Sequence, residues 1–269
     1  MKQTLWTKNY TTLIAASTLG CIGNIAGDFA ISFLVYDETG SVLASALTFA
    51  IGLIPGFVIP LVAAPWMDRL PRKPFLVWDD AISGALYLLA GAYLLRMPFT
   101  YSGYLVFKLL ISSLGALDSL AYDSIYPKLI PAGMEEKGYA VSASLYSVLR
   151  VLIAPLAAVL LDWVGVPVII MAEGICCLAA SAVESTIDLK EECRMDAEGF
   201  SFRLWWQDLK EAAAYLKEEQ GISGMYSYVA VANGFFGGYQ SLWVAFFRTA
   251  PGFTAAMYSM FSVAELKQK

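Results

Sequence analysis

Residues 43–74 read LASALTFAIGLIPGFVIPLVAAPWMDRLPRKP, and they contain the two features that decide the fold. Residues 43–66 carry no charged side chain, and four charges then follow within residues 68–73. About 20 predominantly apolar residues cross a bilayer as an α-helix. The stretch therefore predicts a membrane-spanning helix that ends in a short charged turn at the membrane surface.

The rest of the chain repeats this pattern. Of its 269 residues 58% are hydrophobic and only 15% are charged, and the mean hydropathy is +0.59. Soluble domains average about 45–50% apolar and about 25% charged residues. Membrane spans are predicted at 12–36, 43–66, 76–97, 102–125, 139–162, 167–186 and 223–247, and an eighth begins at Phe253. We therefore expect an all-α integral membrane protein, because a chain of this composition spans a bilayer as helices.

The basic residues outside the predicted spans indicate the orientation. With the N-terminus in the cytoplasm, only Arg96 and Arg248 lie in loops on the outer side, and the other basic loop residues lie on the inner side. Cytoplasmic loops of membrane proteins are enriched in Lys and Arg. We expect a multi-pass protein of the cell (plasma or inner) membrane, with a cytoplasmic N-terminus and the lipid bilayer as a partner.

The composition also excludes several classes of function. The chain contains no histidine, and none of its four cysteines forms a Cys-x-x-Cys pair. Histidine-based metal sites and Ser-His or Cys-His nucleophile pairs are therefore excluded. The net charge of −5 provides no basic face for nucleic acid. We expect no metal, no cofactor, no nucleic-acid partner and no enzyme activity. The alternative is a membrane-embedded enzyme or assembly factor that uses buried Asp residues.

Polar residues inside the first predicted span indicate a cavity, because charge in a bilayer is costly and is rarely without a function. Five polar residues follow three- and four-residue steps and so share one helical face: Ser17, Cys21, Asn24, Asp28 and Ser32. A neighbouring face carries three glycines, Gly20, Gly23 and Gly27. Small residues permit close helix packing. We predict that this helix lines a cavity with its polar face and packs with its glycines.

Other spans also carry polar residues. Arg150 is the deepest charge, near the middle of the fifth span, and Tyr146 lies one turn before it and is predicted to reach a substrate. In the fourth span, Asp118 and Asp123 lie about 140° apart around the helix, so we expect separate tasks for them. Asp118 is predicted to line the cavity, and Asp123 to lie near the inner membrane edge. Lys108 is predicted to extend outward to the membrane surface.

The seventh predicted span carries a polar stripe, in which Tyr226, Asn233 and Gln240 recur every seven residues. Neutral amides and a tyrosine hydroxyl suit a bulky, partly apolar solute. We expect Asn233 and Gln240 to contact a substrate, and a helix-packing role is the alternative.

The charged turn between the second and third spans resembles a known motif. Ala64 precedes, after three spacers, the pair Asp68-Arg69, and two more spacers lead to Arg72-Lys73. This pattern and its position resemble the signature loop of the major facilitator superfamily of secondary transporters. Three further stretches resemble the drug- and siderophore-efflux branch: GDFAISFLVYDETGS (27–41), YDSIYPKLIP (122–131) and RVLIAPLAAVLLDWVG (150–165). The resemblance covers nearly the whole chain.

The resemblance implies a domain organisation. Residues 1–186 would form a complete six-span bundle, and residues 187–222 a cytoplasmic linker that contains an interfacial amphipathic helix. Residues 223–269 would begin a second bundle, with one to two of its helices. The eighth apolar stretch is shorter than the roughly 20 residues of a crossing. We therefore expect a C-terminally truncated chain that inserts but does not transport alone, with a missing C-terminal half as a partner.

The resemblance also implies a function. It predicts proton-coupled efflux of a drug-like or siderophore-like small molecule by alternating access, with protons and that molecule as partners. Spans one and five would lie side by side, so Arg150 is expected to pair with Asp28 as a brace or as part of proton coupling. Glu173 in the sixth span is expected at the periphery of the bundle.

The signature loop is expected to act as a gate. Asp68 would cap the inner ends of helices of the second half, and Arg69 or Arg72 would pair with Asp123 of the fourth span. Together with Lys73, these residues would latch one state of the transport cycle.

Overall fold

The computed structural model describes residues 4–67, 70–189, 202–218, 220–249, 252 and 257, with side chains described in the last helix for residues 221–235 and 246. These residues form helices and no strands. The helices are α1 (Lys8–Thr39), α2 (Val42–Met67), α3 (Arg72–Leu94), α4 (Tyr101–Leu129), α5 (Glu135–Ser185), α6 (Phe202–Glu218) and α7 (Gln220–Thr249).

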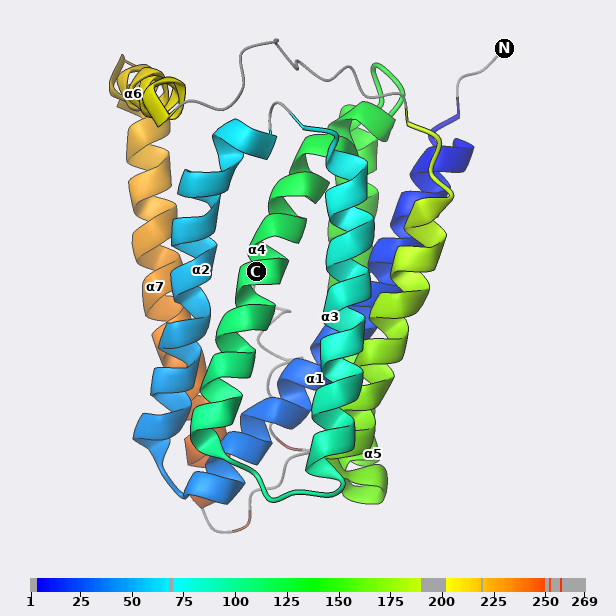
Figure 1. Cartoon of the computed structure of the whole chain (residues 1–269), viewed down its shortest axis with the longest axis vertical. Coiled ribbons are helices and arrows are strands. Elements are labelled where there is room, and N and C mark those ends of the chain that lie inside the picture. Colours follow the sequence, from blue (N-terminus) through cyan, green and yellow to red (C-terminus); the bar gives the residue numbers. More distant parts are fainter. Residues whose placement is uncertain are drawn as a thin grey trace.

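Helix α5 contains two of the predicted spans. It covers 51 residues, but Gly165 has φ 76° and ψ 168°, which is not helical. A positive φ is accessible to glycine at no steric cost, and Pro167 follows. The chain reverses at this point, so that a first arm (135–164) and a second arm (166–185) run antiparallel (Figure 1). The turn lies between the predicted spans 139–162 and 167–186.

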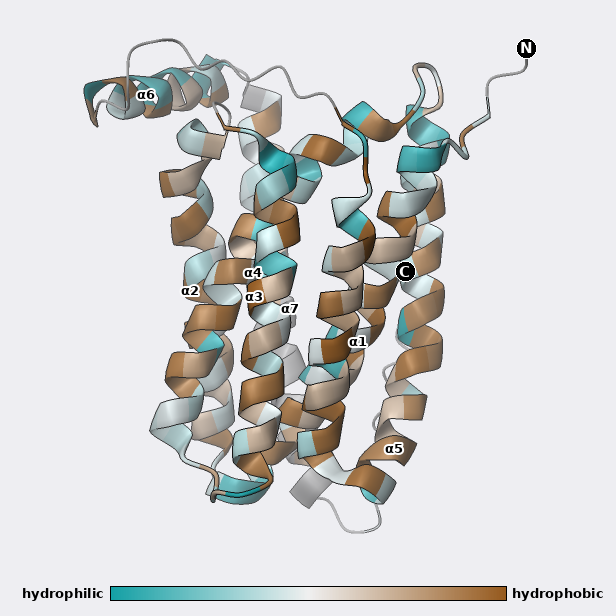
Figure 2. Ribbon diagram, turned by 45° about the vertical axis from the view of Figure 1, so that its right-hand side comes forward, coloured by the Kyte–Doolittle hydropathy of each residue, from teal (hydrophilic) through white to brown (hydrophobic). Residues whose placement is uncertain are grey.

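Five of the described helices, α1 to α5, are long and apolar enough to cross a membrane. They stand side by side, and hydrophobic residues cover most of their length (Figure 2). Their outer surfaces expose large apolar side chains such as Leu43, Phe57 and Trp163, which are 77%, 67% and 82% exposed. Apolar exposure on this scale marks an interaction surface, which for helices of this length is lipid. The described residues thus confirm the prediction of an all-α protein with helices long and apolar enough to span a membrane.

Glycine determines how closely two of the helices approach. Gly84 of α3 and Gly174 of the second arm face each other, and a Cβ atom on either would lie 2.8 Å from the carbonyl oxygen of the other. Such contacts require glycine, because backbone atoms cannot move aside. Close approach at small residues is the usual way in which membrane helices pack.

Side chains join the helices at one end of the bundle. The hydroxyl of the fully buried Tyr10 donates to the Gly138 carbonyl oxygen at 3.2 Å, and the Tyr126 hydroxyl donates to the same oxygen at 2.7 Å. Lys73 Nζ donates to the carbonyl oxygens of Ser185 and Ile187 at 2.8 and 2.5 Å. These contacts hold the ends of α1, α3, α4 and both arms of α5 together.

Helix α6 lies across this same end, roughly perpendicular to the other helices, and α7 runs beside α2 (Figure 1). None of the α6 residues is buried. The Trp205 indole Nε1 donates to the Val62 carbonyl oxygen of α2 at 3.1 Å. The helix expected within residues 187–222 is therefore present as α6, and the span predicted at 223–247 lies within α7.

Candidate functional site

A cavity of about 770 Å³ lies between the five long helices and is bordered by all of them. Seven of its lining residues are acidic: Asp28, Asp79, Asp80, Asp118, Asp123, Glu173 and Glu184. Lys108 is the one basic residue in this lining, which consists of described residues only. Most of the remaining lining residues are small residues or tyrosines. The volume falls in the range of about 300–1,000 Å³ that is typical of small-molecule sites.

Helix α1 presents its predicted polar face to this cavity. Ser17, Cys21, Asn24 and Asp28 all line it. Ser32 does not, and its hydroxyl instead donates to the Asp28 carbonyl oxygen at 2.7 Å. The cavity-lining role predicted for this face is thus confirmed over its first four members.

The neighbouring glycine face of α1 packs against the second arm of α5. A Cβ atom at Gly23 would lie 2.9 Å from the Cys176 Cβ atom, and one at Gly27 would overlap the Glu173 carboxyl group. Gly20 has open space beside it and borders the cavity instead. Two of the three predicted packing glycines therefore pack as expected.

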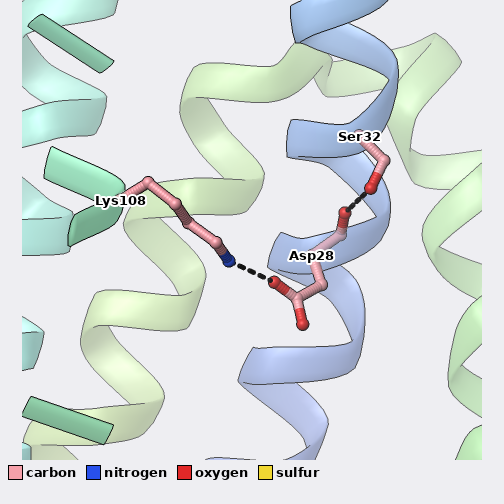
Figure 3. A network of polar contacts seen from close by, with 3 residues as sticks. All are labelled: Asp28, Ser32 and Lys108. Atoms are coloured by element: carbon pink, nitrogen blue, oxygen red, sulfur yellow. Dashed lines mark hydrogen bonds and ion pairs between the residues drawn. The ribbon is translucent and has the colours of Figure 1, made fainter. Parts of the chain in front are cut away.

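The prediction that Arg150 pairs with Asp28 was wrong. The Asp28 Oδ1 atom lies 3.6 Å from Nζ of Lys108 on α4, and Figure 3 shows the Lys108 side chain reaching across to α1. Lys108 thus points into the cavity and not outward to the membrane surface. Arg150 is exposed on the first arm of α5, outside the cavity lining, and forms no ion pair with a described carboxylate. Helices α1 and α5 do pack together, but Arg150 lies close to Cys21 of α1 and not to Asp28, whose ion-pair partner is Lys108.

The expectation for Glu173 was also wrong. Only 2% of this residue is exposed, and its carboxyl group lies against Gly27 of α1 instead of at the periphery. Its Oε2 atom is buried and has no hydrogen-bond partner in the described part of the chain. Asp28 and Lys108 are its charged neighbours, so two carboxyl groups and one ammonium share this part of the cavity.

Three further acids were not predicted from the sequence. Asp79 and Asp80 lie on α3, Glu184 lies near the end of α5, and all three line the cavity. They are close enough to Asp118 of α4 to interact with it electrostatically. The pair of acids within the predicted span 76–97 was the available signal, because a charge inside a span points to function.

Helix α4 contributes more to the cavity than expected. Asp118 lines it as predicted, but Asp123 lines it as well, although the two lie on different faces of the helix. The cavity is wide enough to border both faces. Tyr146 also lines it, and its hydroxyl lies 3.1 Å from the Tyr122 hydroxyl of α4.

The charged turn of residues 68–73 is only partly described, and Asp68 and Arg69 lie outside the described residues. Arg72 Nε donates to the Met67 carbonyl oxygen at 3.1 Å, and Lys73 binds the end of α5 as given above. The expected ion pair between Arg72 and Asp123 is not among the contacts of the described residues. Lys73 thus fixes α3 to the second arm, where its charge also suits a helix C-terminus.

Two of the residues predicted on the seventh span do not reach this cavity. Tyr226 and Asn233 are exposed on α7, and neither belongs to the cavity lining. The side chain of Gln240 lies outside the described residues.

Within the described residues, no three acidic or cysteine side chains converge closely enough to hold a metal ion. Cys21, Cys176 and Cys177 are free thiols. The functional groups of the site are therefore carboxyl groups, one ammonium and tyrosine hydroxyls, and they surround a cavity.

The fold and the site define a class: a helical membrane protein with several spans and an acidic internal cavity. No protein-family model matches the chain, and no curated protein matches it either.

Proposed function

We propose that the protein is a secondary active transporter, in which the acidic cavity holds a small-molecule solute and protons are carried by its carboxyl groups. The single observation that supports this most strongly is the cavity itself. It lies between helices that can span a membrane, and seven acids line it. Charge placed inside a membrane protein is costly and typically marks a pathway for substrates, ions or protons.

The charge balance near Asp28 supports proton coupling. Two carboxyl groups, Asp28 and Glu173, share one ammonium, Lys108. Such a set is electrically neutral only when one carboxyl group carries a proton. Neutral sets are favoured away from bulk water, because an uncompensated charge there costs free energy. A proton can therefore be gained and lost at this set as the cavity faces one side of the membrane or the other.

The resemblance to the major facilitator superfamily gives this proposal a mechanism. The five long helices, with the two arms of α5 counted separately, would supply the six spans of one half of such a transporter, and α7 would belong to the other half. In these transporters the two halves rock around a central site. The drug- and siderophore-efflux branch makes export from the cell the proposed direction.

The test is transport in everted membrane vesicles from cells that express the complete gene and lack their own drug exporters. An imposed pH gradient, acidic inside, should drive accumulation of a fluorescent drug. An uncoupler that collapses the gradient should release it, because accumulation depends on proton exchange. Vesicles with the vector alone are the control. Accumulation no higher than this control, for every solute of a panel of cationic, neutral and anionic compounds, would reject the transporter proposal.

The same proposal places the protein in the cell membrane with its N-terminus in the cytoplasm, as the basic loop residues indicate. In a variant whose four native cysteines are replaced by serine, a cysteine introduced at Asn9 should then react with an impermeant thiol reagent in everted vesicles and not in intact cells. A cysteine at Arg96, at the opposite end of the bundle, is the matched control and should show the reverse pattern. Labelling of position 9 in intact cells would contradict this orientation.

A further inference from the structure

We propose that the cavity selects organic cations, and that the cation is held by a cluster of four carboxyl groups, Asp79, Asp80, Asp118 and Glu184. We call these four residues the inner acid cluster. The inference rests on the proposed function, since it names the class of solute that the cavity takes. It concerns binding, however, and binding can be measured without transport.

The inner acid cluster comes from three helices: two acids from α3, one from α4 and one from the second arm of α5. Glu184 interacts electrostatically with the other three. Like charges held together in a low-dielectric interior repel one another strongly. A cation that enters the cavity would relieve this repulsion, whereas an anion would increase it.

Glu184 provides independent evidence for a ligand site at this cluster. The residue is only 3% exposed, and its Oε2 atom has no hydrogen-bond partner among the described residues. Buried polar atoms are almost always hydrogen-bonded, and an exception calls for an explanation. Because Glu184 lines the cavity, a cation with an N–H group could donate the missing hydrogen bond, and a cation without one could still offset the charge of the carboxylate.

Lys108, the basic residue of the described lining, and Lys73 of α3 already have partners. Lys108 pairs with Asp28, and Lys73, near the end of α5, donates to the carbonyl oxygens of Ser185 and Ile187. Asp123 of α4 adds a further acid to the same cavity. The lining therefore holds more carboxyl groups than its one ammonium can balance.

The remaining wall suits the organic part of such a cation. Tyr87, Tyr122 and Tyr146 line the cavity, and the faces of aromatic rings attract cations. Small residues such as Gly56 and Gly115 leave room beside them, because a Cβ atom at either position would meet no atom within 4 Å. A bulky amine or quaternary cation therefore fits, whereas an acidic chelator of the siderophore type would be repelled.

The experiment compares two probes of nearly the same shape and opposite charge, tetraphenylphosphonium and tetraphenylborate. Saturable binding, displaced by excess unlabelled probe, is measured by equilibrium dialysis on the purified full chain in lipid nanodiscs. We expect saturable binding of tetraphenylphosphonium only. Lowering the pH from about 8 to about 5.5 should weaken it at least tenfold, because protons neutralise the carboxylates that attract the cation.

Variants then locate the site. The double variant Asp80→Asn and Glu184→Gln should raise the Kd for tetraphenylphosphonium at least tenfold. Asp162→Asn is the matched control, since Asp162 is an exposed acid of α5 outside the cavity, and it should leave the Kd within about twofold. A monodisperse gel-filtration peak shows that each variant is folded. If the double variant does not fold, the pH dependence of tetraphenylphosphonium binding to the unmodified chain decides whether carboxylates hold the cation.

Three results would overturn the inference. The first is equal saturable binding of both probes. The second is binding of tetraphenylphosphonium that changes neither in the double variant nor with pH. The third is Mg²⁺ binding at the cluster that excludes the probe. A protein that transports in vesicles but fails these binding tests refutes the cation site alone. A protein that binds the cation but never transports refutes the transporter proposal alone.

Discussion

Replacing Glu173 with glutamine should abolish pH-driven accumulation while leaving the fold intact. Glutamine has nearly the same shape, so the packing against Gly27 is kept. It cannot gain or lose a proton. In this variant the Lys108 ammonium balances the Asp28 carboxylate. The set is then neutral with no proton on a carboxyl group. We expect the coupled proton on Glu173, because this residue is buried whereas the Asp28 side chain is 54% exposed.

The measurement separates coupling from movement of the solute. For a one-for-one exchange, a pH difference of one unit can support about a tenfold solute gradient, since about 1.4 kcal/mol corresponds to a factor of ten. The Glu173→Gln variant should show no such gradient in everted vesicles. Exchange of labelled for unlabelled solute, which needs no net proton movement, should continue.

Two further variants complete this test. Glu136→Gln is the matched control, because Glu136 is an exposed acid at the start of α5, and it should accumulate solute as the unmodified protein does. Asp28→Asn tests the neighbouring carboxyl group. Full pH-driven accumulation by Glu173→Gln, together with its loss in Asp28→Asn, would move the coupled proton to Asp28 and refute the prediction.

Alanine at Gly174 should destabilise the whole bundle. The added methyl group would lie 2.8 Å from the Gly84 carbonyl oxygen and 3.0 Å from the Leu88 backbone nitrogen. Neither atom can turn aside as the end of a side chain could, so α3 and the second arm of α5 must separate. Overpacking of this kind costs roughly 1–3 kcal/mol. The thermal midpoint of the purified protein, in one fixed detergent, should fall clearly.

Gly115→Ala provides the control for this prediction. A Cβ atom at Gly115 on α4 meets no atom within 4 Å. In a helix interior alanine is favoured over glycine by up to about 1 kcal/mol, so this variant should be as stable as the unmodified protein or more so. The reciprocal variant Gly84→Ala should behave as Gly174→Ala does. Equal midpoints for all three variants would show that the α3–α5 contact does not limit stability.

The sequence by itself determined the class of fold. Twenty-residue apolar runs predict membrane-spanning helices, because a bilayer leaves the backbone no other partner for its hydrogen bonds. Gly165 and Pro167 lie between two predicted spans, and the turn within α5 is found there. Helical periodicity also predicted which face of α1 lines a cavity, because residues three and four apart share a face.

Only the tertiary structure decided how the charges are combined. Periodicity orients a residue on its own helix but does not say which helix that face meets. Lys108, not Arg150, lies opposite Asp28 because α4 borders the cavity across from α1. Glu173 is buried because the second arm of α5 packs against the glycine face of α1.

The inner acid cluster is the clearest case. Its four acids lie on three helices, and Glu184 comes more than 100 residues after Asp79 and Asp80. Each acid alone could have been an ordinary charge near the end of a span. Packing of α3, α4 and α5 around one space brings them together, and that packing depends on contacts such as Gly84 with Gly174 that no single helix contains.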